Sequence, residues 1–169
     1  MAVFVTWFSR AEDEQVGVHL VEAARRYNDE RFDALIVPAN IAAEVAVGRA
    51  LSKVLRPFGS VEHVGRFLQD GATYSHQLNV LLNVAASVVG VARLPDTIRG
   101  LLNRLRKLRN DVAHEGGCAA QSRKDAAEHL AAAIFGVHYA KLLDRMADAA
   151  TARGPILPTV PKAGSAEGS

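Results

Sequence analysis

The sequence predicts an all-α fold, an antiparallel bundle of four to six helices. Apolar residues recur at helical spacing nearly throughout, and the alternation typical of strands is absent apart from a possible short segment at 2–8. Hydrophobic residues make up 49% of the 169 residues, which is enough to bury one core without metals or disulfides. We therefore expect one domain over residues 1–150.

Glycine and proline divide the chain into segments of helical length. Pro95-Asp96 opens the fifth segment and Gly116-Gly117 closes it. The last segment is rich in small residues, chiefly alanine, which allows close packing in the core or across a subunit interface. Residues 151–169 are rich in Pro, Gly, Ser and Ala, and they predict a flexible tail. Helices are expected at about 12–28, 33–55, 61–70, 73–91, 96–115 and 123–149.

Composition excludes several classes of protein. The single cysteine, Cys118, excludes an internal disulfide and a metal site built on cysteine pairs. The histidines and carboxylates show no metal-ligand spacing, and glycine-rich phosphate loops are absent, so we expect neither a metal nor a cofactor. The sequence shows no apolar run long enough to cross a bilayer and no signal-peptide pattern. A cytoplasmic protein without membrane contact is expected.

The positive charge is concentrated in the fifth helix. The formal net charge is only +2, but residues 99–109 contain five basic side chains and no acidic one. This segment is a candidate site for the phosphates of RNA, although a solvated helix face is the alternative. The basic residues are Arg99, Arg104, Arg106, Lys107 and Arg109.

Two charged residues interrupt apolar stripes. Arg109 falls inside the stripe of the fifth helix, and Glu44 falls inside that of the second. An inward charge needs a partner, so we expect Glu44 and Arg109 to form a bidentate ion pair. The pair either orients the guanidinium for function or only fixes helix register. The stripes comprise Ile98, Leu101, Leu102, Leu105, Leu108 and Val112, and Val37, Ile41, Gly48, Leu51 and Leu55.

His114 follows Arg109 by five residues at the end of the same helix. On an ideal helix their side chains lie about 140° apart, whereas Asn110 and His114 share a face. Arg109 and His114 can therefore converge only if the helix bends near Gly116-Gly117 or if two copies meet across a two-fold axis. A histidine placed only for its preference for helix C-termini is the alternative.

The segment from Leu108 to Gly116, LRNDVAHEG, resembles the signature of HEPN domains, the higher eukaryotes and prokaryotes nucleotide-binding superfamily. That signature is Arg-x(4–6)-His, commonly with a polar residue after the arginine. The resemblance covers about residues 12–149 and includes the long early helix, the motif helix and the alanine-rich closing helix. A tyrosine that closely follows the histidine in one HEPN branch is absent here.

The resemblance implies a metal-independent endoribonuclease of toxin–antitoxin or anti-phage systems, with a homodimeric composite site and a possible antitoxin or inhibitor as partner. Arg109 and His114 would be catalytic, Asn110 would support them, and Glu44 would orient Arg109. The 2′-hydroxyl of RNA would attack, which leaves a 2′,3′-cyclic phosphate and a 5′-hydroxyl end. Two alternatives stay open: a non-catalytic HEPN-like module that binds nucleotide, RNA or protein, and a regulatory helical dimer.

Overall fold

The computed structural model describes residues 11–115 and 121–152, which are mainly helical and contain no strand. The all-α prediction is confirmed. The segment 2–8, Gly116-Gly117 and the tail from residue 153 lie outside the described residues, whereas Thr151 and Ala152 belong to the last helix. The long helices are α1 (Ala11–Asn28), α2 (Ile36–Leu55), α6 (Asp96–Glu115) and α7 (Arg123–Ala152). The shorter elements are the 3-10 turn η2 (Arg56–Phe58), α3 (Val61–Arg66), the π turn η3 (Phe67–Gly71), α4 (Tyr74–His76), the π turn η4 (Gln77–Leu81) and α5 (Leu82–Val89).

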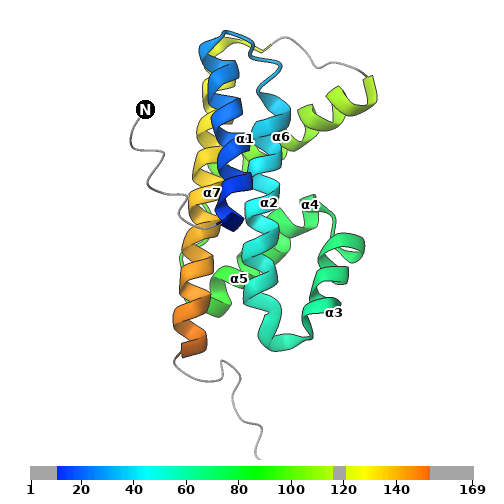
Figure 1. Cartoon of the computed structure of the whole chain (residues 1–169), viewed down its shortest axis with the longest axis vertical. Helices are drawn as coiled ribbons and strands as arrows, with labels where there is room; N and C mark the ends of the chain where they lie inside the picture. Colours follow the sequence, from blue (N-terminus) through cyan, green and yellow to red (C-terminus); the bar gives the residue numbers. More distant parts are fainter. Residues whose placement is uncertain (1–10, 116–120, 153–169) are drawn as a thin grey trace, which may run out of the picture.

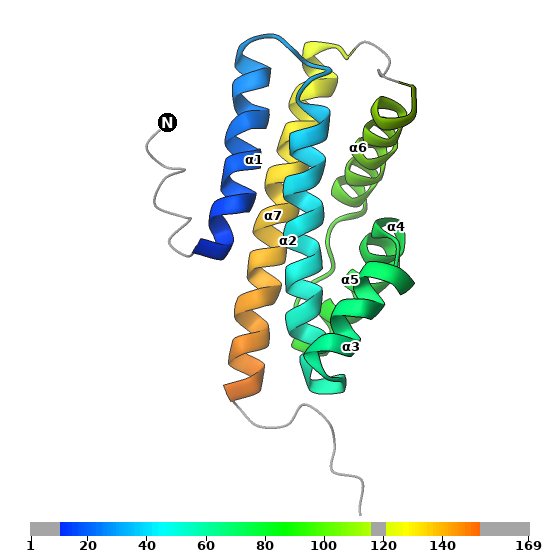
Figure 2. The ribbon, with the colours of Figure 1, turned by 45° about the vertical axis from the view of Figure 1, so that its right-hand side comes forward.

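The helix α2 lies at the centre of the fold. It packs against α1 and α7 on one side and against α6, η4 and α5 on the other (Figures 1 and 2). Helices that follow one another along the chain run antiparallel, as α1 and α2 do, and as α6 and α7 do (Figure 2). The helices α2 and α7 run in the same direction, whereas α1 and α6 run the opposite way, so not every pair of packed helices is antiparallel (Figure 2).

Small residues explain the close packing of α7. Ala132, Ala133, Gly136 and Ala140 are buried on one face of this helix. A Cβ atom built on Gly136 would lie 3.1 Å from Cδ1 of Leu102 in α6, which is tighter than most real contacts. Packing within the core therefore accounts for the small residues of the last helix.

Ion pairs join α7 to its neighbours at both ends. Near the end of α2, Nζ of Lys53 lies 3.0 Å from a carboxylate oxygen of Asp144 and 2.7 Å from one of Asp148. Burial alone lowers the pKa of Lys53, but these two carboxylates outweigh it, so the pKa is raised above its usual range. At the other end, Arg123 pairs with Glu30 at 2.9 Å.

The expected helix at 73–91 is interrupted by a π turn. The hydroxyl of Thr73 accepts a hydrogen bond from the backbone N–H of His76 and so caps α4. The buried amide of Gln77 donates to the carbonyl oxygens of Leu68 and Ala72, at 2.8 and 2.9 Å. These bonds tie the start of η4 to the turn before it. None of the described helices is both long and apolar enough to cross a membrane.

Candidate functional site

The motif residues lie on the last two turns of α6, which stays α-helical from Asp96 through Glu115. Arg109 is half-buried and donates from Nη1 to Oδ1 of Asn110, 3.2 Å away. His114 is exposed in the last turn. Because the helix is unbroken between them, Arg109 and His114 lie about 140° apart around its axis. One copy of the chain therefore does not place them on the same face.

The predicted ion pair between Glu44 and Arg109 is wrong: no ion pair joins them within 11–115 and 121–152. Glu44 is half-buried and accepts a hydrogen bond from the side-chain amide of Asn40, at 3.0 Å. Arg109 binds Asn110 within its own helix. A helical wheel gives the angle of a side chain but not its height against the neighbouring helix, and this explains the error.

Tyr74 of α4 is buried within reach of the charge of Glu44, and its place in the sequence did not single it out. Its side chain is 8% exposed, and its hydroxyl has no hydrogen-bond partner among the described residues. Burial, and then the charge of Glu44, raises the pKa of Tyr74 well above its usual range, while Arg106 acts in the opposite direction. The charges of Glu44 and Arg106 therefore both act on this hydroxyl. The signal that could have identified Tyr74 is that a buried tyrosine hydroxyl usually needs a partner.

The basic side chains of α6 differ in their surroundings. Arg99 pairs with Asp96 at 2.7 Å, and Arg104 lies 3.9 Å from Asp125 of α7. Lys107 is exposed and has no ion-pair partner in the described part of the chain. Residues 99–109 contain no acidic side chain. Asp96, which precedes this segment, and Asp125 of α7 nevertheless compensate part of its positive charge.

The sequence predicts Arg106 to be one of several surface cations that bind RNA phosphates. Its side chain is only half-exposed, and its Nε is fully buried without a hydrogen-bond partner among the described residues. Arg106, one turn before Arg109, is the basic residue of α6 whose charge acts on Tyr74.

A polar stripe runs along the face of α6 that meets η4. Asn103 and Asn79 exchange two hydrogen bonds between their side-chain amides, at 3.1 and 2.8 Å. At 100° per residue, the stripe spans an arc of about 80°. The α6 polar stripe consists of Arg99, Asn103, Arg106, Asn110 and His114.

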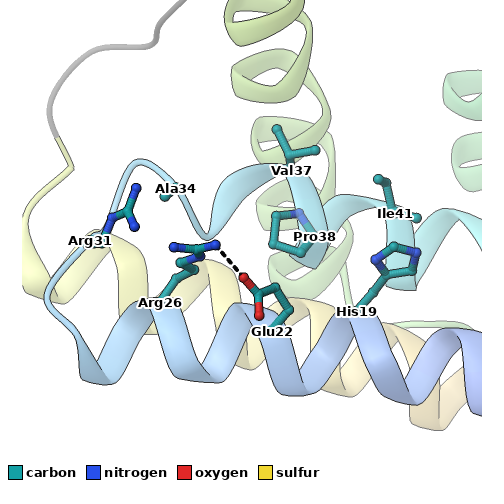
Figure 3. Close-up of a pocket in the computed structure, with 8 residues that line it drawn as sticks. All are labelled: His19, Glu22, Arg26, Arg31, Ala34, Val37, Pro38 and Ile41. Carbon is teal, nitrogen blue, oxygen red and sulfur yellow. Dashed lines mark ion pairs between the residues drawn. The ribbon is translucent and has the colours of Figure 1, made fainter.

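A shallow pocket lies away from this stripe, between α1 and the first turns of α2 (Figure 3). Its volume is about 280 Å³. Glu22 and Arg26, both on α1, form an ion pair with a 2.6 Å contact on one side of the pocket. The pocket contains none of the predicted site residues. It is lined by His19, Glu22, Arg26, Arg31, Ala34, Val37, Pro38 and Ile41.

No group of three or more His, Cys, Asp or Glu side chains within the described ranges is arranged to hold a metal ion. No protein-family model matches the chain, and no curated protein or solved structure is significantly similar to it. The resemblance to HEPN domains thus rests on the motif, its helical context and the order of the helices.

Proposed function

We propose that the chain is a metal-independent endoribonuclease of the HEPN type, active as a homodimer, with a role in a toxin–antitoxin or anti-phage system. The observation that carries this proposal is the position of Arg109, Asn110 and His114 on the last turns of one unbroken helix, beside further basic residues. In this proposal a second copy supplies the complementary motif, since one copy does not place Arg109 and His114 on one face.

The proposed reaction uses the 2′-hydroxyl of RNA as nucleophile. His114 of one protomer takes the 2′-hydroxyl proton as the oxygen attacks phosphorus, and the bond from phosphorus to the 5′-oxygen breaks. Solvent gives a proton to the departing 5′-oxygen, and His114 later returns its proton to solvent. Arg109 stabilises the negative charge that develops on the phosphoryl oxygens. The products are a 2′,3′-cyclic phosphate and a 5′-hydroxyl end.

The direct test is incubation of the purified protein with single-stranded RNA in the presence of a chelator. His114→Ala and Arg109→Ala should each lower the cleavage rate by about 10²-fold or more. The matched controls, His63→Ala and Arg66→Ala, change exposed residues of α3 and should cleave as the wild type does. Equal cleavage by all five proteins, or none by the wild type, would rule out this activity.

Mixing the two inactive variants tests the shared site. If Arg109 of one protomer acts with His114 of the other, each mixed dimer regains one intact combination. Half of the dimers are mixed and half of their sites are intact, so exchange of subunits should restore about a quarter of the wild-type rate. No recovery, with exchange shown by differently tagged subunits, would contradict a shared site.

The second candidate function is a non-catalytic module that binds RNA or nucleotide. The angle of about 140° between Arg109 and His114 on a continuous helix favours it. A wild-type protein that binds RNA, forms dimers and leaves the RNA intact would support this alternative.

A further inference from the structure

The pocket between α1 and α2 combines an apolar wall with arginine side chains at one end (Figure 3). Val37, Pro38 and Ile41 of α2 form the wall, and each of them is only half-buried. Val37 and Ile41 belong to the apolar stripe that the sequence predicts for the second helix, so apolar surface expected in the core is partly open to solvent here. A ligand that covers this wall would gain free energy from the burial of apolar surface.

The turn that follows α1 sets the position of the arginine end. Glu30 has a left-handed φ of 56°, and the backbone N–H of Arg31 donates to the carbonyl oxygen of Arg26, 2.9 Å away. This hydrogen bond fixes the backbone of Arg31 beside the last turn of α1. Figure 3 shows the side chains of Arg26 and Arg31 at one end of the pocket and those of His19 and Ile41 at the other.

The side chains that line the pocket carry one net positive charge. Arg26 is paired with Glu22 at 2.6 Å, whereas exposed Arg31 forms no ion pair within the described residues. Two arginines and one glutamate give the lining a formal charge of +1, with His19 counted as neutral. One negative group on a ligand would balance this charge. A phosphate monoester carries about −1.5 to −2 at pH 7 and would leave excess negative charge beside Glu22.

The volume of the pocket limits the size of its ligand. The cavity of about 280 Å³ lies just below the roughly 300–1,000 Å³ of sites that hold drug-sized molecules. A peptide of several residues or a strand of RNA is too large to be enclosed there. The ligand is therefore small, with one negative charge at the arginine end and an apolar body along the wall.

We propose that this pocket binds a small monocarboxylate with an aromatic or branched apolar body. The guanidinium of Arg31 donates two N–H groups to the two carboxylate oxygens, and the body of the acid lies along Val37, Pro38 and Ile41. The inference goes beyond the proposed function and does not rest on it, because neither Arg109 nor His114 lines the pocket.

The first experiment is an NMR titration of the isotope-labelled full chain with phenylacetate and with isovalerate. We expect at least one of these acids to bind with a Kd on the order of 1 mM. The backbone amide signals of residues 19–41 should shift more than those of α6 and α7. The absence of binding by both acids up to about 20 mM would overturn the proposal.

Two relatives of the acid that binds test the requirement for one negative charge. The matching amide has nearly the same shape without the charge, and the matching phosphate monoester carries more charge. We expect the Kd to rise at least about tenfold for the amide and about threefold for the phosphate. Equal affinity for the amide, or tighter binding of the phosphate, would overturn a monocarboxylate site.

Arg31→Gln and Arg25→Gln form a matched pair of variants. Each removes one positive charge near the end of α1, but exposed Arg25 does not line the pocket. We expect Arg31→Gln to raise the Kd of the acid about tenfold and Arg25→Gln to change it by less than about twofold. Equal losses would show that the overall charge attracts the acid without a contact to Arg31, and they would overturn the proposed site.

Ala34→Leu tests the location of the acid without a change of charge. Ala34 lines the pocket, so the larger side chain fills part of it and should raise the Kd at least about fivefold. Circular dichroism and the melting temperature show whether the variant is folded. A folded Ala34→Leu variant with unchanged affinity would place the acid elsewhere and overturn the proposal. If this variant unfolds, the comparison of Arg31→Gln with Arg25→Gln decides.

Discussion

Two contacts of α6 are held in contrasting ways. Against α7, the α7 side, Leu102 packs on Gly136 through apolar contacts. Against η4 and α4, the α4 side, Asn103 pairs with Asn79, and the charge of Arg106 acts on the buried Tyr74. The first arrangement maximises buried apolar area, whereas the second buries polar atoms at a cost in stability. Since a plain bundle would pack more stably without those polar atoms, we expect the α4 side to serve function and the α7 side to serve folding.

The largest expected loss of stability comes from a substitution in the contact between α6 and α7. Leu102→Ala removes a fully buried side chain from the contact with Gly136 and should lower the free energy of unfolding by about 2–5 kcal/mol. Leu108→Ala, which truncates a partly buried leucine of the same helix, should cost less. Urea unfolding followed by circular dichroism measures both. Equal losses would mean that the contact with α7 does not dominate the anchoring of α6.

The second prediction concerns the paired amides on the α4 side. Asn103→Leu leaves Oδ1 of the half-buried Asn79 without its donor and should cost about 1–3 kcal/mol. The double variant, with Asn79→Leu added, should recover part of this loss because both polar groups are gone. Additive losses in urea unfolding would show that the two amides are not energetically coupled.

The third prediction concerns His129, a polar residue buried on the α7 side. It is 1% exposed, and neither ring nitrogen has a partner among the described residues. Burial and then the charge of Arg104 lower its pKa, while the nearby Asp125 and Glu128 oppose this shift more weakly. The folded protein thus keeps this ring neutral at a pH where the unfolded chain is already protonated.

The sign of the resulting pH dependence follows from linkage. Below pH ~6.5 the unfolded chain binds a proton that folded His129 does not, so the free energy of unfolding falls as the pH drops toward the lowered pKa. His129→Leu should flatten this slope in urea titrations between about pH 5 and 7.5. Half-buried His138, whose pKa is also lowered by burial, supplies a remaining slope of the same sign. An unchanged slope in His129→Leu would mean that the ring is protonated in the fold.

The smallest expected effect sets the baseline for the comparison. Glu62 and Arg66 form an ion pair within α3, with side chains 78% and 61% exposed. Glu62→Ala should change the free energy of unfolding by less than about 0.5 kcal/mol, because water and salt screen the pair. A larger loss of stability would show that α3 contributes more to the fold than its exposed position suggests. The effects on the α4 side would then have to be compared with another exposed ion pair.

The sequence predicts the helices well where their ends carry clear signals. Pro95 sets the start of α6 at Asp96, as expected, and the apolar stripe of that helix is buried around Leu102 and Leu105. The buried face of α2 is less predictable because helices cover it on several sides. Alanines make up five of the ten buried residues of α2, and the large residues Val37 and Ile41 are only partly buried.

The candidate site could be predicted only in part. The motif on α6 is readable, because its residues are close in sequence. The surroundings of Glu44 are not, since they depend on how far α4 and α6 are displaced along α2. Periodicity carries no information on that displacement. Whether Arg109 and His114 are catalytic stays a prediction.

The opposite ends of α6 and α7 have a practical consequence. The helix α6 ends at one end of the bundle, and α7 ends at the other, where Lys53 holds it against α2 (Figure 1). A reporter or an affinity handle joined after α7 therefore leaves the bundle far from the motif. Labelled proteins made in this way suit the subunit-exchange and RNA-binding measurements, whereas an insertion next to Glu115 would alter the motif itself.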